Sequence, residues 1–166
     1  DPNSGTEFKE VKLYVAHYLY QFWTEVQGVA TTLSKAYVYT GDKRYGLAGA
    51  ALVDRWADTY HQHDLTDYDD YGGQGAGYTQ GRIGECAVFE AWALSADAVF
   101  PMIYDSGTIN FLMEKAGHYG LANDKSSSSK IWDNWKNNIL LEAYDGAKKG
   151  RVDGNFGFAQ AATTAA

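Results

Sequence analysis

The stretch LSKAYVYTGDKRYGLAGAALVDRWADTY, residues 33–60, decides the fold class of this chain. At its centre, Thr40-Gly41-Asp42 combines a glycine that can end one helix with an aspartate that can cap the next. A link this short joins two helices as an antiparallel pair. The apolar residues that follow the link recur at helical spacing and predict one buried stripe, made of Tyr45, Ala48, Leu52, Trp56 and Tyr60.

Helical patterns continue on both sides of this hairpin. We expect the first helix over residues 7–40, in two pieces that meet at Gly28, because glycine weakens a helix interior. Ser129, the last of four consecutive serines, is a candidate cap for the fifth helix. The other expected helices cover residues 43–61, 85–100, 108–121 and 130–149, and a sixth opens at Phe158. Because no alternating strand pattern occurs, the chain is predicted to be all-α, built of antiparallel helical hairpins.

Composition narrows the classes of partner. The chain has 166 residues, about one domain, and a formal net charge of −7, which disfavours nucleic acid as a partner. No run of 18 apolar residues occurs, so no membrane span is expected. The single cysteine, Cys86, excludes an internal disulfide framework, and its apolar neighbours predict a buried position.

The two ends of the chain suggest a piece of a larger protein. Residues 1–8 are typical of a tail derived from cloning or of a disordered tail, and no signal peptide is recognisable there. We expect residues 9–166 to form a single helical domain, a fragment of a larger one, because the last helical pattern stops without a cap. Such a fragment would expose apolar helix faces and could self-associate through them.

An acidic loop is predicted over residues 63–81. Aspartates at positions 64, 67, 69 and 70 offer oxygen ligands of the kind that Ca²⁺ prefers. The spacing lacks the closing glutamate of a known calcium loop, so a solvated acidic loop is the favoured interpretation. We therefore expect no metal and no cofactor, with Ca²⁺ at residues 64–70 as the minor alternative.

Five segments carry a resemblance to a known family when they are taken in order. They are residues 14–23, 36–45, 52–58, 81–85 and 154–160. Together they resemble the helical domain of heparinase II/III-like polysaccharide lyases, over the chain from Lys9 to its end. The resemblance implies part of an incomplete α/α toroid, a β-sandwich domain missing from this chain, and an acidic polysaccharide as substrate. Such enzymes are usually exported by bacteria, which implies a periplasmic or secreted parent protein.

The resemblance also implies catalytic residues for β-elimination. This reaction needs a group that neutralises the uronate carboxylate, a base and an acid. Asn155, in a turn that opens a helix, is the candidate neutraliser; its alternative role is that of a turn residue or cap. His17 and Tyr14 are the candidates for proton transfer. The family's motif has a histidine where this chain has Ala159, which cannot exchange a proton.

Further residues are candidates for substrate binding. Arg82 can clamp a carboxylate in bidentate fashion, although an ion pair within the chain would use it equally well. Gln21 and Gln160 are candidate sugar contacts. Tyr18 and Trp23 offer stacking faces, and their alternative role is helix packing.

Two other functions stay open at this stage. The chain could be a non-catalytic carbohydrate-binding or structural fragment, which Ala159 favours. It could also be a glycoside hydrolase on an α/α toroid, which needs two carboxylates about 5–9 Å apart across a cleft. The available carboxylates are Glu25, Asp58, Glu85 and Glu90.

Overall fold

The computed structural model describes residues 9–60 and 82–148, and every regular element within them is a helix. Side chains at 9–21, 82–86, 143 and 146–148 lie outside the description. The all-α prediction is confirmed for the described residues. The elements are α1 (Lys9–Thr40), α2 (Lys43–Thr59), α3 (Arg82–Val99), the 3₁₀ helix η3 (Phe100–Tyr104), α4 (Ser106–Tyr119), α5 (Ser128–Trp135), the π-helix η4 (Lys136–Leu140) and α6 (Leu141–Lys148).

The link between α1 and α2 forms as expected. Gly41 adopts the left-handed conformation, with φ +66°, and its N–H donates to the carbonyl of Tyr37 at 2.8 Å. The carboxylate of Asp42 accepts from the backbone N–H of Arg44 at 2.9 Å, which caps α2. The hairpin prediction is therefore confirmed.

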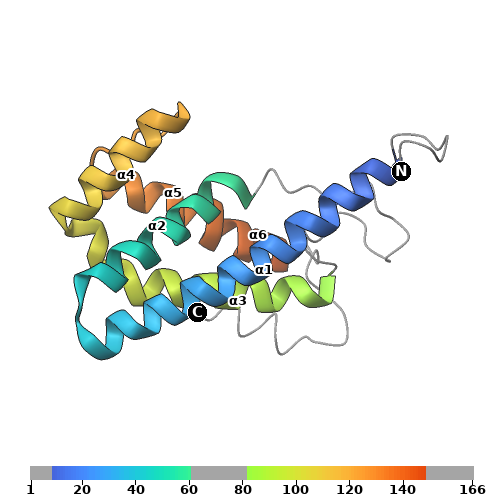
Figure 1. Ribbon diagram of the computed structural model, residues 1–166, viewed down its shortest axis with the longest axis horizontal. Helices are drawn as coiled ribbons and strands as arrows, with labels where there is room; N and C mark the ends of the chain where they lie inside the picture. Colours follow the sequence, from blue (N-terminus) through green and yellow to red (C-terminus); the bar gives the residue numbers. More distant parts are fainter. Residues whose placement is uncertain (1–8, 61–81, 149–166) are drawn as a thin grey trace.

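The third helix runs parallel to the first. Trp23 and Ser34, in order along α1, contact Trp92 and Ser95, in order along α3: the Trp rings are 6.3 Å apart, and the Ser34 hydroxyl donates to the Ser95 carbonyl at 3.4 Å. The second helix packs antiparallel against both (Figure 1). The result is a three-helix layer in which α1 and α3 share a direction.

Aromatic side chains form the centre of this layer. The Trp56 and Trp92 rings stack 4.8 Å apart at an interplanar angle of 6°, and Trp23 meets both of them edge-on. Tyr60 and Phe89 extend the cluster, with ring centroids 5.4 Å apart. Each large aromatic buries about 150–250 Å² on folding, so these five residues are a major source of the driving force.

Two predictions about the helices are wrong in detail. Gly28 does not divide the first helix: α1 is continuous, since core contacts at Trp23 and Ala30 lie on both sides of the glycine. The fifth helix begins two residues earlier than expected, because Ser127 rather than Ser129 accepts from the backbone N–H of Lys130, at 3.3 Å.

The predicted stripe of α2 is confirmed at Trp56 and Tyr60, which are buried, and is wrong over the first half of the helix. Tyr45 is 39% exposed, and Ala48 and Leu52 are only half-buried. The buried line instead begins at Gly46 and Gly49, and a Cβ on Gly46 would lie 2.7 Å from the Met102 sulfur. Glycines at these positions let α2 approach Met102 and Val99 closely.

The helix α3 is unusually apolar. By length and composition alone, one described segment, Ala87–Tyr104, could cross a membrane, with a mean hydropathy of 1.2 over 18 residues. Half of that segment is buried inside the protein, and core helices pass the same test. The exposed positions of α3 within this segment are Ala87, Glu90, Leu94 and Asp97.

The two glycines predict opposite effects of a methyl group. Gly28→Ala should raise the free energy of unfolding by about 0.5–1 kcal/mol, because nothing lies within 4 Å of the added Cβ and alanine favours helix. Gly46→Ala should lower it, because the new methyl collides with Met102. Urea unfolding followed by circular dichroism measures both, and a destabilised Gly28→Ala protein would show that the helix needs a flexible point there.

Candidate functional site

The predicted catalytic and binding positions of the first helix lie on one face of α1. The described backbone of α1 is helical throughout, so positions 14, 17, 18 and 21 share a face by their spacing. That face continues through Glu25, Thr32 and Tyr39, which are exposed, and lies opposite the core line of Trp23, Ala30 and Ser34. The side chains of Tyr14, His17, Tyr18 and Gln21 themselves lie outside the described residues.

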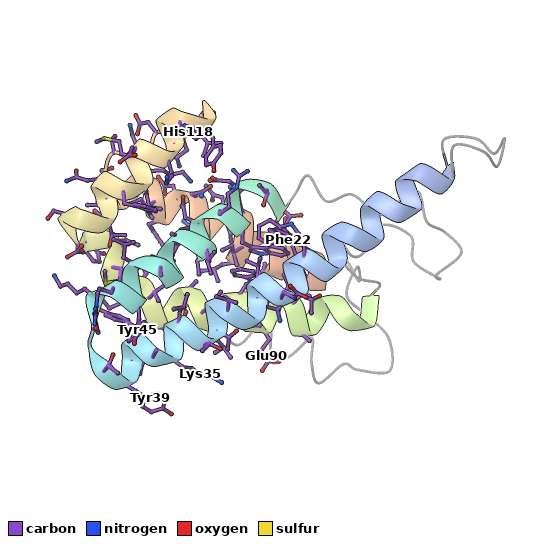
Figure 2. The ribbon with its side chains drawn as sticks, viewed as in Figure 1. Phe22, Lys35, Tyr39, Tyr45, Glu90 and His118 are labelled. Carbon is purple, nitrogen blue, oxygen red and sulfur yellow. The ribbon has the colours of Figure 1, made fainter. Side chains whose placement is uncertain are left out.

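Trp23 lies in the aromatic core. Its side chain is 7% exposed, and its ring contacts Phe22, Trp56 and Trp92 at centroid distances of 5.4, 5.0 and 6.3 Å. In the structure, Trp23 thus packs between helices, which is the alternative role considered for it above. Phe22, its neighbour, is 46% exposed and marks the edge of the cluster (Figure 2).

The end of α2 contacts the first half of α3 at one end of the layer. Tyr60 follows the last residue of α2, and its ring contacts Phe89 near the start of α3. Arg82 is the first residue of α3, and the start of α3 lies toward the same end of the layer as the first half of α1 (Figure 1). The side chain of Arg82 and all of Asn155 and Gln160 lie outside the described residues.

The loop considered as a minor calcium-binding alternative, residues 64–70, falls in a part of the chain that the structure does not describe. In the ranges that the structure describes, no group of three His, Cys, Asp or Glu side chains could hold a metal ion.

Three of the four carboxylates considered for a hydrolase, Glu25, Asp58 and Glu90, have described side chains. Glu25 and Glu90 are exposed on α1 and α3, and the side chain of Glu85 lies outside the described residues. Asp58 is engaged elsewhere: its Oδ1 accepts from Lys125 at 2.6 Å and from Asn134 at 3.0 Å. None of the described geometry therefore sets two of these carboxylates across a cleft.

Asp58 belongs to a buried charged cluster that sequence reasoning missed. The ammonium of Lys125 is fully buried and lies 3.1 Å from Asp54 Oδ1 and 2.6 Å from Asp58 Oδ1. Asp54 Oδ1 also accepts from the amide of Asn134 and from the indole N–H of Trp135, each at 3.0 Å. We call these five residues, Asp54, Asp58, Lys125, Asn134 and Trp135, the buried lysine cluster.

The local backbone conformation at Lys125 places its side chain in the buried lysine cluster. Lys125 has a left-handed backbone, with φ 54°, and the side chain of Asn123 accepts from its N–H at 3.0 Å. The Asn123 amide in turn donates to the Lys130 carbonyl at 2.8 Å, which ties the loop to α5. This turn directs the side chain of Lys125 into the interior, between α2 and α5.

Within the buried lysine cluster, the positive charge of Lys125 is balanced by the neighbouring carboxylates of Asp54 and Asp58. Burial raises the pKa of Asp54, whereas the positive charge of Lys125 lowers it; the neighbouring Asp58 raises it again. Because Lys125 is inaccessible to solvent, the cluster cannot present its ammonium to a dissolved substrate. Its chemistry is therefore that of a structural anchor. A sequence signal existed: Asp54 sits inside the buried stripe of α2, and Asp58 follows one turn later.

Comparisons with known proteins add nothing to the placement of the site. No family model, no curated protein and no solved structure matches this chain.

The buried lysine cluster predicts a large effect of a single substitution. Lys125→Met should lower the free energy of unfolding by about 3–5 kcal/mol, because it leaves buried carboxylates without their cation. Lys130→Met is the matched control, since its ion pair with Asp124 is about half exposed and should matter far less. Thermal unfolding of both variants measures the contrast, and equal losses would argue against an anchoring role for Lys125.

The same variant predicts a pH dependence with a definite sign. Without Lys125 the pKa of Asp54 rises further, because the nearby positive charge that lowers it is gone. A carboxyl whose folded-state pKa is raised stabilises the fold while protonated, and that contribution is lost as pH rises through the pKa. The stability deficit of Lys125→Met should therefore be smaller at about pH 5 than at about pH 7. Chemical unfolding at both values measures it, and a constant deficit would contradict the assignment.

Proposed function

We propose that this chain is the helical domain of a heparinase II/III-like polysaccharide lyase and forms part of an α/α toroid. One observation supports this most: the first half of α1 and the start of α3 point toward the same end of the helical layer (Figure 1). Those two elements carry five of the positions that the family resemblance marks, namely 14, 17, 18, 21 and 82. The antiparallel α1–α2 hairpin followed by a parallel α3 is also the repeat that a toroid uses.

In this proposal the substrate is a uronic-acid polysaccharide. The amide of Asn155 hydrogen-bonds the uronate carboxylate and stabilises the charge that develops when the neighbouring carbon loses its proton. His17 and Tyr14 share the base and acid roles: one takes that proton and the other protonates the departing glycosidic oxygen. The products are an unsaturated uronate and a new chain end, with no water consumed.

Binding in this proposal must overcome the negative charge of the chain. The formal net charge of −7 repels a polyanion, so attraction has to come from a few cations placed at the site. Arg82 supplies one, by a bidentate contact to a carboxylate. Gln21, Gln160 and Tyr18 supply uncharged contacts to the sugars. A parent protein that is periplasmic or secreted, and a β-sandwich domain beside the toroid, belong to the same proposal.

A second function has its own supporting observation. Ala159 occupies the place of a histidine in the family's motif and cannot carry a proton. A domain that binds acidic polysaccharide without cleaving it is therefore the alternative.

The test is the ultraviolet absorbance of the unsaturated product. We expect it to rise when the chain is incubated with one of heparan sulfate, hyaluronan, chondroitin or alginate. Asn155→Ala should lower that rate by about 10²–10³-fold. Asn110→Ala, on the exposed surface of α4, should leave it unchanged.

Other results separate the two functions. Binding to a glycan panel without product, with cleavage gained in Ala159→His, would favour the binding domain. Neither product nor binding, for any of the four polysaccharides, would contradict both.

A further inference from the structure

A groove lies between α1 and α3 on the side of the layer away from the aromatic cluster. Its volume is about 260 Å³, and it is lined mainly by small side chains, among them Ala91 and Ala98 of α3 and Thr31 of α1. Leu94 lines it as well and is 54% exposed. This is the uncovered side of the apolar segment Ala87–Tyr104, of which the protein itself buries only half.

Charges of opposite sign flank the groove. Lys35 projects from α1 and Glu90 from α3; both line the groove, and both are exposed. Figure 2 shows the two side chains pointing away from the ribbon on the same side. Neither takes part in the salt bridges found between residues that the structure describes.

We propose that a second copy of this chain covers the groove about a two-fold axis. A surface with a cation on one wall and an anion on the other is complementary to itself, because a two-fold rotation exchanges the walls. Each Lys35 then faces the partner subunit's Glu90, and the pair occurs twice. The small side chains between them allow two helix layers to approach closely, and Leu94 supplies apolar area at the centre.

The charges favour a protein partner over a lipid surface. A membrane would have to accommodate Lys35 and Glu90 beside its apolar region, where desolvation of unpaired charge is costly. In a two-fold dimer the same charges neutralise each other. The groove residue Lys35 lies farther along α1 than positions 14–21 of the proposed polysaccharide site, and the test needs no polysaccharide.

Charge reversal tests the proposal by sedimentation velocity over a concentration series. We expect a dimer, with a dissociation constant that rises about tenfold or more in Lys35→Glu and in Glu90→Lys, since each change opposes like charges at two places. The double variant Lys35→Glu/Glu90→Lys should dimerise nearly as well as the original, because the pairs are restored with their signs exchanged. Glu114→Lys and Lys136→Glu, exposed on α4 and η4, are the controls and should have no effect.

Three results would overturn the proposal. A monomer at every concentration would exclude a second copy as the occupant. A dimer that ignores both reversals would place the interface on another face. A monomer that floats with vesicles of neutral and anionic lipid would identify the groove as a lipid-binding surface instead. Circular dichroism on each variant verifies that the helices are retained.

Discussion

The ammonium of Lys125, buried between Asp54 and Asp58, is the constraint on which the arrangement of α5 depends. A lone buried charge is strongly unfavourable, so the lysine can occupy this position only while both carboxylates are within reach. Those carboxylates stand one turn apart on α2, and Asn134 and Trp135 of α5 donate to them as well. One charged group thereby fixes how the second half of the chain docks on the first.

In the first half of the chain, the aromatic cluster holds α1, α2 and α3 together without charged groups. Trp56 of α2 stacks on Trp92 of α3, and Trp23 of α1 closes the edge of the pair, so one residue from each helix defines the three-helix layer. The contacts between these rings act together with the close approach at Gly46 and Gly49 to hold the three helices in place. The lysine cluster then supplies the specificity that apolar packing lacks, because its contacts tolerate no shift of α5 along α2.

Local chemistry explains which features could be predicted from the sequence. The end of α1 at Gly41 and the cap of α2 at Asp42 depend on a few neighbouring residues, and both form as expected. On α2, Trp56 and Tyr60 are buried as predicted. The first half of its buried face was predicted wrongly, because it depends on the close approach of Gly46 to Met102, which is distant in sequence.

The buried lysine cluster could not be predicted because it also depends on residues that are far apart in the sequence. Lys125 is 71 residues from Asp54 and 67 from Asp58, and nothing near it in sequence indicates burial. Its left-handed backbone and the Asn123 turn become meaningful only once α2 is in place. For the proposed polysaccharide site, helical spacing places positions 14, 17, 18 and 21 on one face of α1, and their side chains lie outside the described residues.

The length of α1 allows the groove and the proposed polysaccharide site to operate together. Lys35 lies 14 residues from Gln21 and 18 from His17, which corresponds to about 21 and 27 Å along a helix. A second copy over the groove would thus leave the first half of α1 uncovered at that distance. The core line of α1, at Trp23, Ala30 and Ser34, is fully used within the layer, so the remaining faces are the ones available for partners. A helix of 32 residues can therefore carry the groove residue Lys35 and the proposed substrate positions 14–21 at separate places along its length.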